Sequence, residues 1–88
     1  MKARDGYILR NIAGEYMLMP AGAMVGTFRG TVLLNELSAF LWEKLQEPCT
    51  RSDLLSEILV QYNIDEGTAA ADLDAVLADM RQMGIIEE

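Results

Sequence analysis

The amino-acid sequence predicts an α+β fold, a three-stranded antiparallel sheet followed by three helices. Three observations indicate this class. Residues 7–12 and 15–19 are rich in branched and aromatic side chains, and Ala13-Gly14 between them suits a two-residue hairpin turn, because glycine readily takes the positive φ such turns need. Residues 32–34 form a third apolar run that is too short for a helix. After it, apolar residues recur at helical spacing.

The connections between these elements can also be read from the sequence. Pro20 cannot donate a ladder hydrogen bond and closes the second strand. Residues 21–30 are glycine-bearing and are expected to form a loop, with a brief extended piece at 25–28. The third strand should pass directly into the first helix, since Asn35 can cap its free N–H groups and Glu36 places negative charge at its positive end. The apolar face expected for this helix comprises Leu37, Phe40, Leu41 and Leu45.

Two more helices are predicted after residue 50. Thr50 and Asp53 have the spacing of a capping box, and the apolar face that follows comprises Leu54, Leu55, Ile58, Leu59 and Tyr62. Asp65 is the expected N-cap of the third helix, residues 66–83, and Gly84 stands where a left-handed C-terminal residue is favoured. The buried stripe of this helix comprises Ala69, Leu73, Val76, Leu77, Met80 and Met83. We expect Ile85-Ile86 to dock back as a short extended tail.

The composition indicates one acidic domain, residues 1–88. Seven basic and fourteen acidic residues give a formal net charge of −7. Such a chain repels nucleic acid and anionic membranes, because binding to both depends on clustered Lys and Arg, so neutral or basic partner surfaces are expected. The single cysteine, Cys49, permits no internal disulfide, which fits a reducing compartment. No signal core or membrane-length apolar stretch is present, and a cytoplasmic location is expected.

Catalysis and cofactor binding are poorly supported. The chain has no histidine, the residue most often used for proton transfer near neutral pH and for binding zinc. No activating partner stands near Cys49 in the sequence, so an inert thiol is expected there. The acidic residues are spread along a helix rather than set in a calcium loop, and the loop glycines match no phosphate-binding motif. We therefore expect no enzyme, no metal and no cofactor.

One stretch resembles a known family. The motif Leu-Asn-Glu-Leu-Ser-Ala-Phe-Leu-Trp, from Leu34 to Trp42, stands between the hairpin and the closing stretch 71–86, and in this order the three resemble the PqqD family, also described as RiPP recognition elements. The resemblance spans about Gly6 to Ile86. It implies a winged-helix-like, non-catalytic domain that holds the leader segment of a ribosomally made precursor peptide. Such domains present the leader to a modifying enzyme, often a radical S-adenosylmethionine enzyme.

The resemblance also implies where the leader binds. In the family the leader adds as a strand to the edge of the third strand and rests against the third helix, which here places Val32, Leu33 and Leu34 at the pairing edge. The apolar side of the cleft would comprise Leu73, Val76, Leu77 and Met80, with Asp72 and Asp79 as contacts for a basic leader residue. The longer glycine-bearing loop and Trp42 resemble the broader PqqD-like group rather than members that serve pyrroloquinoline quinone synthesis.

Physical reasoning that does not use the family resemblance also indicates residues 32–34 as the pairing edge. A strand edge presents unpaired N–H and C=O groups, and residues 32–34 include no Lys or Pro that would block pairing. The alternative is that the loop 21–30 covers this edge. The edge could also pair two copies, so both a monomer and an edge-paired homodimer stay open.

Three other functions are considered. A winged-helix nucleic-acid-binding regulator would need a basic recognition helix, whereas the third helix carries Arg81 against four acidic residues. A stand-alone enzyme lacks the motifs. An interaction subunit that binds only the maturase stays open.

Overall fold

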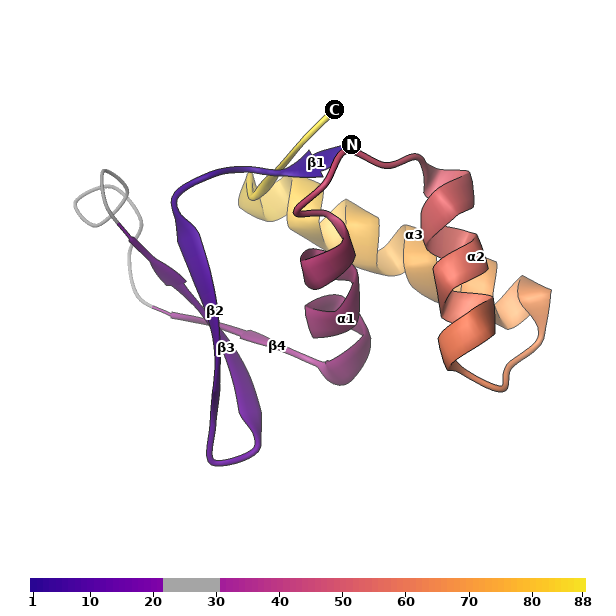
Figure 1. The fold of residues 1–88 in the computed structure, drawn as a ribbon, viewed down its shortest axis with the longest axis horizontal. Helices are drawn as coiled ribbons and strands as arrows, with labels where there is room; N and C mark the ends of the chain where they lie inside the picture. The colour runs from indigo at the N-terminus through magenta and orange to yellow at the C-terminus, as the bar shows by residue number, and fades with distance from the viewer. Residues whose placement is uncertain (22–30) are drawn as a thin grey trace.

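The computed structural model describes residues 1–21 and 31–88 (Figure 1). Its elements are β1 (Lys2–Ala3), β2 (Tyr7–Ile12), β3 (Glu15–Pro20), β4 (Val32–Leu34), α1 (Glu36–Lys44), α2 (Arg51–Gln61), α3 (Glu66–Met83) and β5 (Ile86–Glu87). The antiparallel sheet has the order β2-β3-β4, and with the three helices it confirms the predicted α+β class. The extended piece predicted at 25–28 lies outside the described residues.

The hairpin turn has the predicted conformation. Ala13 and Gly14 both have positive φ, 54° and 82°, as a two-residue turn of the left-handed type requires. A positive φ is strained for alanine. The turn tolerates this strain because the twist of this turn type matches the twist of the two flanking strands. The turn sets Ile12 opposite Glu15, and β2 and β3 pair from there to Tyr7 opposite Pro20.

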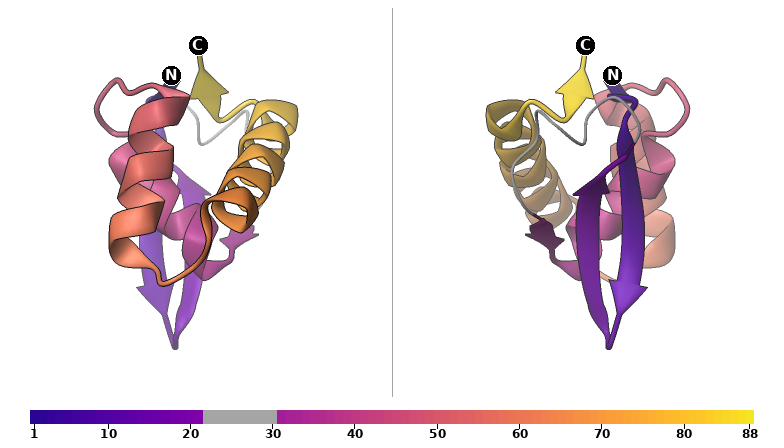
Figure 2. Two further views of the ribbon diagram at one scale, coloured as in Figure 1. Left: turned by 90° about the vertical axis from the view of Figure 1, so that its right-hand side faces the viewer. Right: turned by 90° about the vertical axis from the view of Figure 1, so that its left-hand side faces the viewer.

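The helices lie on one side of the sheet. Figures 1 and 2 show α1 next to the sheet, α2 on the side of α1 away from the sheet, and α3 running alongside α1 so that its C-terminal half lies beside β4. The core fills the space between these layers, and its largest fully buried side chains are Leu18, Leu41, Leu45, Leu54, Ile58, Leu73, Leu77, Met80 and Ile85. Among the described residues, no helix is both long and apolar enough to cross a membrane.

All three predicted N-caps are confirmed. Asn35 Oδ1 accepts from the Ser38 N–H at 2.8 Å. Thr50 and Asp53 form a capping box in which each side chain accepts from the other residue's backbone N–H. The Asp65 side chain accepts from the Thr68 N–H at 3.0 Å. The C-terminal prediction also holds, because Gly84 ends α3 with φ of 73°.

The buried faces of α1 and α2 differ in part from the prediction. Ala39 and Trp42 are buried on α1, whereas Leu37 and Phe40 are half-buried. The helix turns this face inward because Trp42 packs edge-on against Tyr7 of β2, with ring centroids 6.0 Å apart. Leu59 of α2 and Met83 of α3 were also expected to be buried, and they are 37% and 36% exposed.

The chain ends are joined by a pairing that the sequence did not predict. β1 and β5 form a separate two-stranded antiparallel sheet, with Ala3 opposite Ile86. The Ala3 N–H donates to the Leu45 carbonyl at 2.7 Å, and the Arg4 N–H donates to the Ile85 carbonyl at 2.8 Å. The predicted docking of the tail is confirmed, and β1 is its partner. This pairing also holds the end of α1 beside the end of α3.

Candidate functional site

β4 is an outer strand of the three-stranded sheet. It pairs with β3 through Tyr16 opposite Leu34, Met17 opposite Leu33 and Leu18 opposite Val32. On its other side, no strand from the described ranges 1–21 and 31–88 pairs with it. This outer edge is where the sequence placed the pairing strand.

The hairpin register determines which backbone groups of β4 face outward. Opposed residues in an antiparallel pair alternate between hydrogen-bonded and non-hydrogen-bonded positions. A two-residue turn makes Ile12 and Glu15 a hydrogen-bonded pair, and the alternation from there reaches Gly6 and Ala21, where the Ala21 N–H donates to the Gly6 carbonyl at 2.8 Å. The same alternation leaves Pro20 in a non-hydrogen-bonded position, as its missing N–H requires.

This alternation makes Leu33 the outward-facing residue of β4. Met17 directs its N–H and C=O toward β2, so its neighbours Tyr16 and Leu18 direct theirs toward Leu34 and Val32. The N–H and C=O of Leu33 therefore point away from β3. Its side chain is 63% exposed, whereas Leu34 is 8% exposed and packs in the core.

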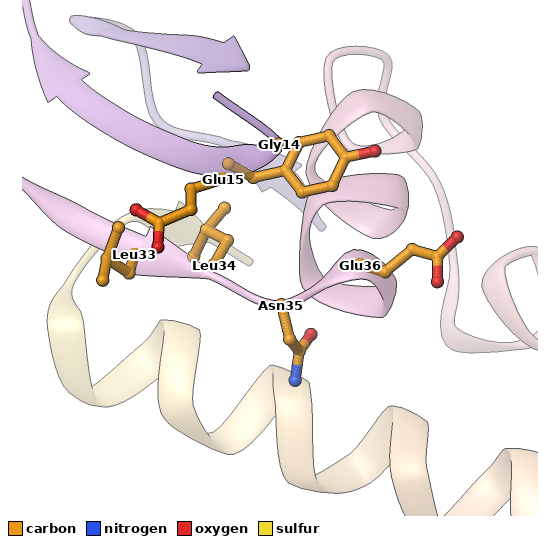
Figure 3. Close-up of a pocket in the computed structure, with 7 residues that line it drawn as sticks. Gly14, Glu15, Leu33, Leu34, Asn35 and Glu36 are labelled. Carbon is orange, nitrogen blue, oxygen red and sulfur yellow. The ribbon is translucent and has the colours of Figure 1, made fainter. Parts of the chain in front are cut away.

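A cleft separates this edge from α3. Its strand side consists of β4 with Asn35 and Ser38, and its helix side consists of Val76, Asp79, Met80, Gln82 and Met83. The cleft has a volume of about 320 Å³. A second hollow of about 350 Å³ continues it along α3 and adds Leu37, Asp72 and Ala75. We call the two together the β4–α3 cleft. Figure 3 shows the Asn35 side chain directed from the strand toward α3.

Most of the predicted site residues are brought together in this cleft. The residues that line it are Val32, Leu33, Leu34, Asp72, Val76, Asp79 and Met80. Met80 is 1% exposed and forms part of the floor. The other two, Leu73 and Leu77, are 0% and 1% exposed and pack in the core beneath α3, lining neither hollow.

Several lining residues were not predicted. These are Asn35, Leu37, Ser38, Ala75, Gln82 and Met83. On α3, helical spacing from Val76 gives Asp72, Asp79 and Met83, so the signal for that side was present in the sequence. On the strand side, Asn35 and Ser38 are joined by the N-cap hydrogen bond, and their position beside α3 depends on tertiary packing.

The charged side chains of the cleft are acidic. Asp72 and Asp79 are both exposed, and no basic residue is among the described residues that line it. Arg81, the basic residue in the last turn of α3, pairs with Glu88 at 2.6 Å. The β4–α3 cleft therefore combines an outward-facing backbone, an apolar floor and an acidic rim.

The cysteine is not activated. Cys49 is half-buried, and its Sγ lies 3.9 Å from the Lys44 carbonyl. Burial raises the pKa of the Cys49 thiol, with the N-terminus opposing and Asp53 adding to the shift. The thiol form is thus favoured at neutral pH.

Comparison with known proteins identifies the family. Residues 15–86 match the family model described as Coenzyme PQQ synthesis protein D (PqqD). The chain belongs to the PqqD family. The resemblance read from the Leu34–Trp42 motif is thereby confirmed, and the family match runs from the start of β3 to the first residue of β5 and includes the whole β4–α3 cleft. No curated protein sequence matches this PqqD-family chain.

Two solved structures share the fold of this PqqD-family protein. One is described as TbiB1 in complex with the TbiA(beta) leader peptide, with a TM-score of 0.77, 22% identity and coverage of 99% of this chain and 95% of that chain. The other is described as lasso peptide synthetase B1 complexed with the leader peptide, with a TM-score of 0.75, 15% identity and coverage of 99% and 96%. At these identities the likeness establishes the fold.

Proposed function

We propose that the protein binds the leader segment of a ribosomally synthesised precursor peptide and presents it to a modifying enzyme, without catalysing a reaction itself. The observation that carries this proposal is the outward-facing backbone of Leu33 beside the β4–α3 cleft. Membership of the PqqD family supports it, as does the fold shared with two proteins whose structures contain leader peptides. The modifying enzyme we propose is a radical S-adenosylmethionine enzyme, as the sequence resemblance implies.

The proposed binding mode is strand addition. The guest segment forms main-chain hydrogen bonds with the N–H and C=O of Leu33, which give affinity with little dependence on sequence. Its side chains alternate between the two faces of the enlarged sheet. Those on the helix side enter the β4–α3 cleft and contact Val76, Met80 and Met83, where methionine adapts to varied apolar groups. Asp72 and Asp79 at the rim attract a basic leader residue.

The predicted residues that lie in the core have an indirect part in this mode. Leu73 and Leu77 are buried in the core beneath α3. We propose that they hold the helix side of the cleft in place, while Val76 and Met80 contact the guest.

A titration followed by NMR tests the proposal. Isotope-labelled protein is titrated with leader peptides encoded beside its gene, and a scrambled peptide of the same composition is the control. We expect saturable chemical-shift changes at residues 31–35 and at Val76, Asp79, Met80 and Met83. Changes confined to the exposed side of α2, around Val60, would contradict strand addition at β4.

The maturase-only alternative can be separated from leader binding. Capture of the maturase by the purified protein is compared with and without the leader. Leader binding predicts that the peptide joins the captured complex and that the protein binds it in the absence of enzyme. An interaction subunit would capture the enzyme and leave the peptide in solution. The acidic lining of the cleft supports a peptide guest over nucleic acid, since phosphates would be repelled there.

A further inference from the structure

A second, smaller cavity lies where β3, α1 and the end of α2 meet. It is lined by three aromatic rings and two carboxylates, those of Tyr16, Phe40, Tyr62, Glu36 and Glu43, and has a volume of about 160 Å³. We call it the aromatic–acidic pocket. A water molecule takes about 30 Å³ in the liquid, so the pocket has room for a group the size of a guanidinium or ammonium head.

Three elements far apart in the sequence build this pocket. Glu36, Phe40 and Glu43 stand four and three residues apart on α1, so they share one face of the helix. Tyr62 is the C-cap of α2, and its ring packs edge-on against the ring of Phe40, with the two ring centroids 5.6 Å apart. Tyr16 comes from β3, where it lies opposite Leu34 on the face that the helices cover.

Three electrostatic features of the pocket favour the binding of a cation. Glu36 and Glu43 form no ion pair with any residue of the described chain. The C-terminal end of α2, which carries partial negative charge, has no basic residue in its last turn. The aromatic faces add their negative quadrupole. None of the described residues that line the pocket is basic.

One aromatic ring of the pocket already contacts a cation of the protein itself. Lys44 Nζ lies 5.3 Å from the centroid of the Phe40 ring, in the range of a cation–π contact. Lys44 is also paired with Glu57 at 3.3 Å and is not among the pocket residues. Burial, followed by Glu36 and Tyr16, raises the pKa of Tyr62, so its hydroxyl stays neutral at physiological pH.

The aromatic–acidic pocket is continuous with the end of β4. A larger open hollow of about 560 Å³ shares Tyr16 and Glu36 with it and is also lined by Leu33, Leu34 and Asn35. Figure 3 shows Glu15 beside Leu33 and the Glu36 side chain directed away from the strand. A peptide paired with Leu33 would therefore leave β4 at the mouth of this hollow, within a few residues of the pocket.

We propose that the aromatic–acidic pocket binds an arginine or lysine side chain of the precursor peptide, on a residue flanking the segment that pairs with β4. This proposal rests on the proposed leader binding and adds a second, charge-selective contact to it. The cation is held between ring faces and the carboxylates of Glu36 and Glu43. The pocket does not include the rim residues Asp72 and Asp79, although Asp72 lines a neighbouring hollow together with Glu36 and Tyr62.

The first test requires no leader. Labelled protein is titrated with N-acetyl-arginine amide, and with the citrulline analogue, which has nearly the same shape and no charge. We expect shift changes at Tyr16, Glu36, Glu43 and Tyr62 with the arginine probe only. Glu43→Gln should weaken this binding about three- to tenfold. The matched control, Glu66→Gln, makes the same charge change at the start of α3 and should leave it unaltered.

The second test locates the basic residue in the peptide. Each arginine or lysine of a leader encoded beside the gene is replaced in turn by citrulline or norleucine. One replacement should weaken binding about three- to tenfold in the unmodified protein and have a clearly smaller effect in the Glu43→Gln variant, where Glu36 and the rings remain. Equal responses to arginine and citrulline amides, or additive losses in this cycle, would overturn the pocket proposal while leaving strand addition at β4 intact.

Discussion

At the scale of single residues, Leu33 is the position on which the proposed function depends. Hydrophobicity alone would describe it as one of three similar residues in β4. The alternation that begins at the Ala13-Gly14 turn distinguishes it, because only Leu33 in that strand directs both backbone polar groups away from β3. Its neighbours Val32 and Leu34 hold the strand to the sheet. A backbone change at Leu33 should therefore affect binding of a guest more than it affects folding.

Leu33→Pro tests this difference. Proline removes the outward N–H and places its ring where a guest strand must approach, so leader affinity should fall by more than about 1 kcal/mol. The β3–β4 ladder does not use that N–H, so the variant should remain folded. The measurement is leader affinity by isothermal titration calorimetry, with circular dichroism to confirm folding. Leu33→Ala, which keeps the N–H, should retain most of the main-chain contribution.

A contrasting substitution checks the register. Leu34→Pro removes an N–H that points toward Tyr16, so it should destabilise the sheet itself. Unchanged leader affinity in a folded Leu33→Pro variant would exclude pairing at this edge. Greater destabilisation by Leu33→Pro than by Leu34→Pro would show that the alternation has the opposite phase.

At the scale of elements, the helix ends were predictable because the interactions that form them are local. Asn35, Thr50 and Asp65 each bond to a backbone N–H three residues ahead, a relation the sequence contains in full. The faces of the helices were harder to predict. Trp42 is buried because it meets Tyr7, a contact between residues far apart in the chain that helical spacing cannot reveal. Helix boundaries were therefore predicted well, and helix orientations less well.

The cap at Asp65 gives a pH prediction. Hydrogen bonds from the Thr68 hydroxyl, and then from its N–H, hold the pKa of Asp65 below its ordinary value. A carboxylate with a lowered pKa stabilises the folded state above its unfolded pKa of about 3.9, and this contribution is lost as the pH falls below that value. Asp65→Asn keeps a capping oxygen and cannot titrate. The free energy of unfolding, measured by urea denaturation, should therefore fall less between pH 5 and pH 3 in the variant.

The test depends only on the difference in pH dependence of the unfolding free energy between Asp65→Asn and the unmodified protein. Asp53 and Asp74 also have lowered pKa values, from hydrogen bonds to Thr50 and Arg51, and they contribute the same acid sensitivity to both proteins. Parallel pH profiles for Asp65→Asn and the unmodified protein would show that the Asp65 charge adds nothing to the stability of α3.

At the scale of the whole molecule, the features missed in the sequence are those that join distant segments. β1 and β5 have two residues each, too few for any periodicity, and they form only because the chain ends meet. The division of the apolar stripe of α3 into core residues, such as Leu73, and cleft residues, such as Val76, likewise depends on where β4 lies. The strand edge itself was predictable, because a short apolar run lacking Lys and Pro is a local feature.

The pairing of the chain ends leads to a stability prediction. Ile85 is fully buried, its N–H donates to the Met80 carbonyl and its carbonyl accepts from the Arg4 N–H, so it joins α3 to the residue that follows β1. Ile85→Val removes one buried methylene from this junction and should lower the free energy of unfolding by about 0.5–1.5 kcal/mol in urea denaturation. Val60→Ala, at a side chain that is 86% exposed, should change it by less than about 0.5 kcal/mol. If both substitutions have equally small effects, the packing of Ile85 between α3 and the N-terminal segment does not contribute to the cooperative fold.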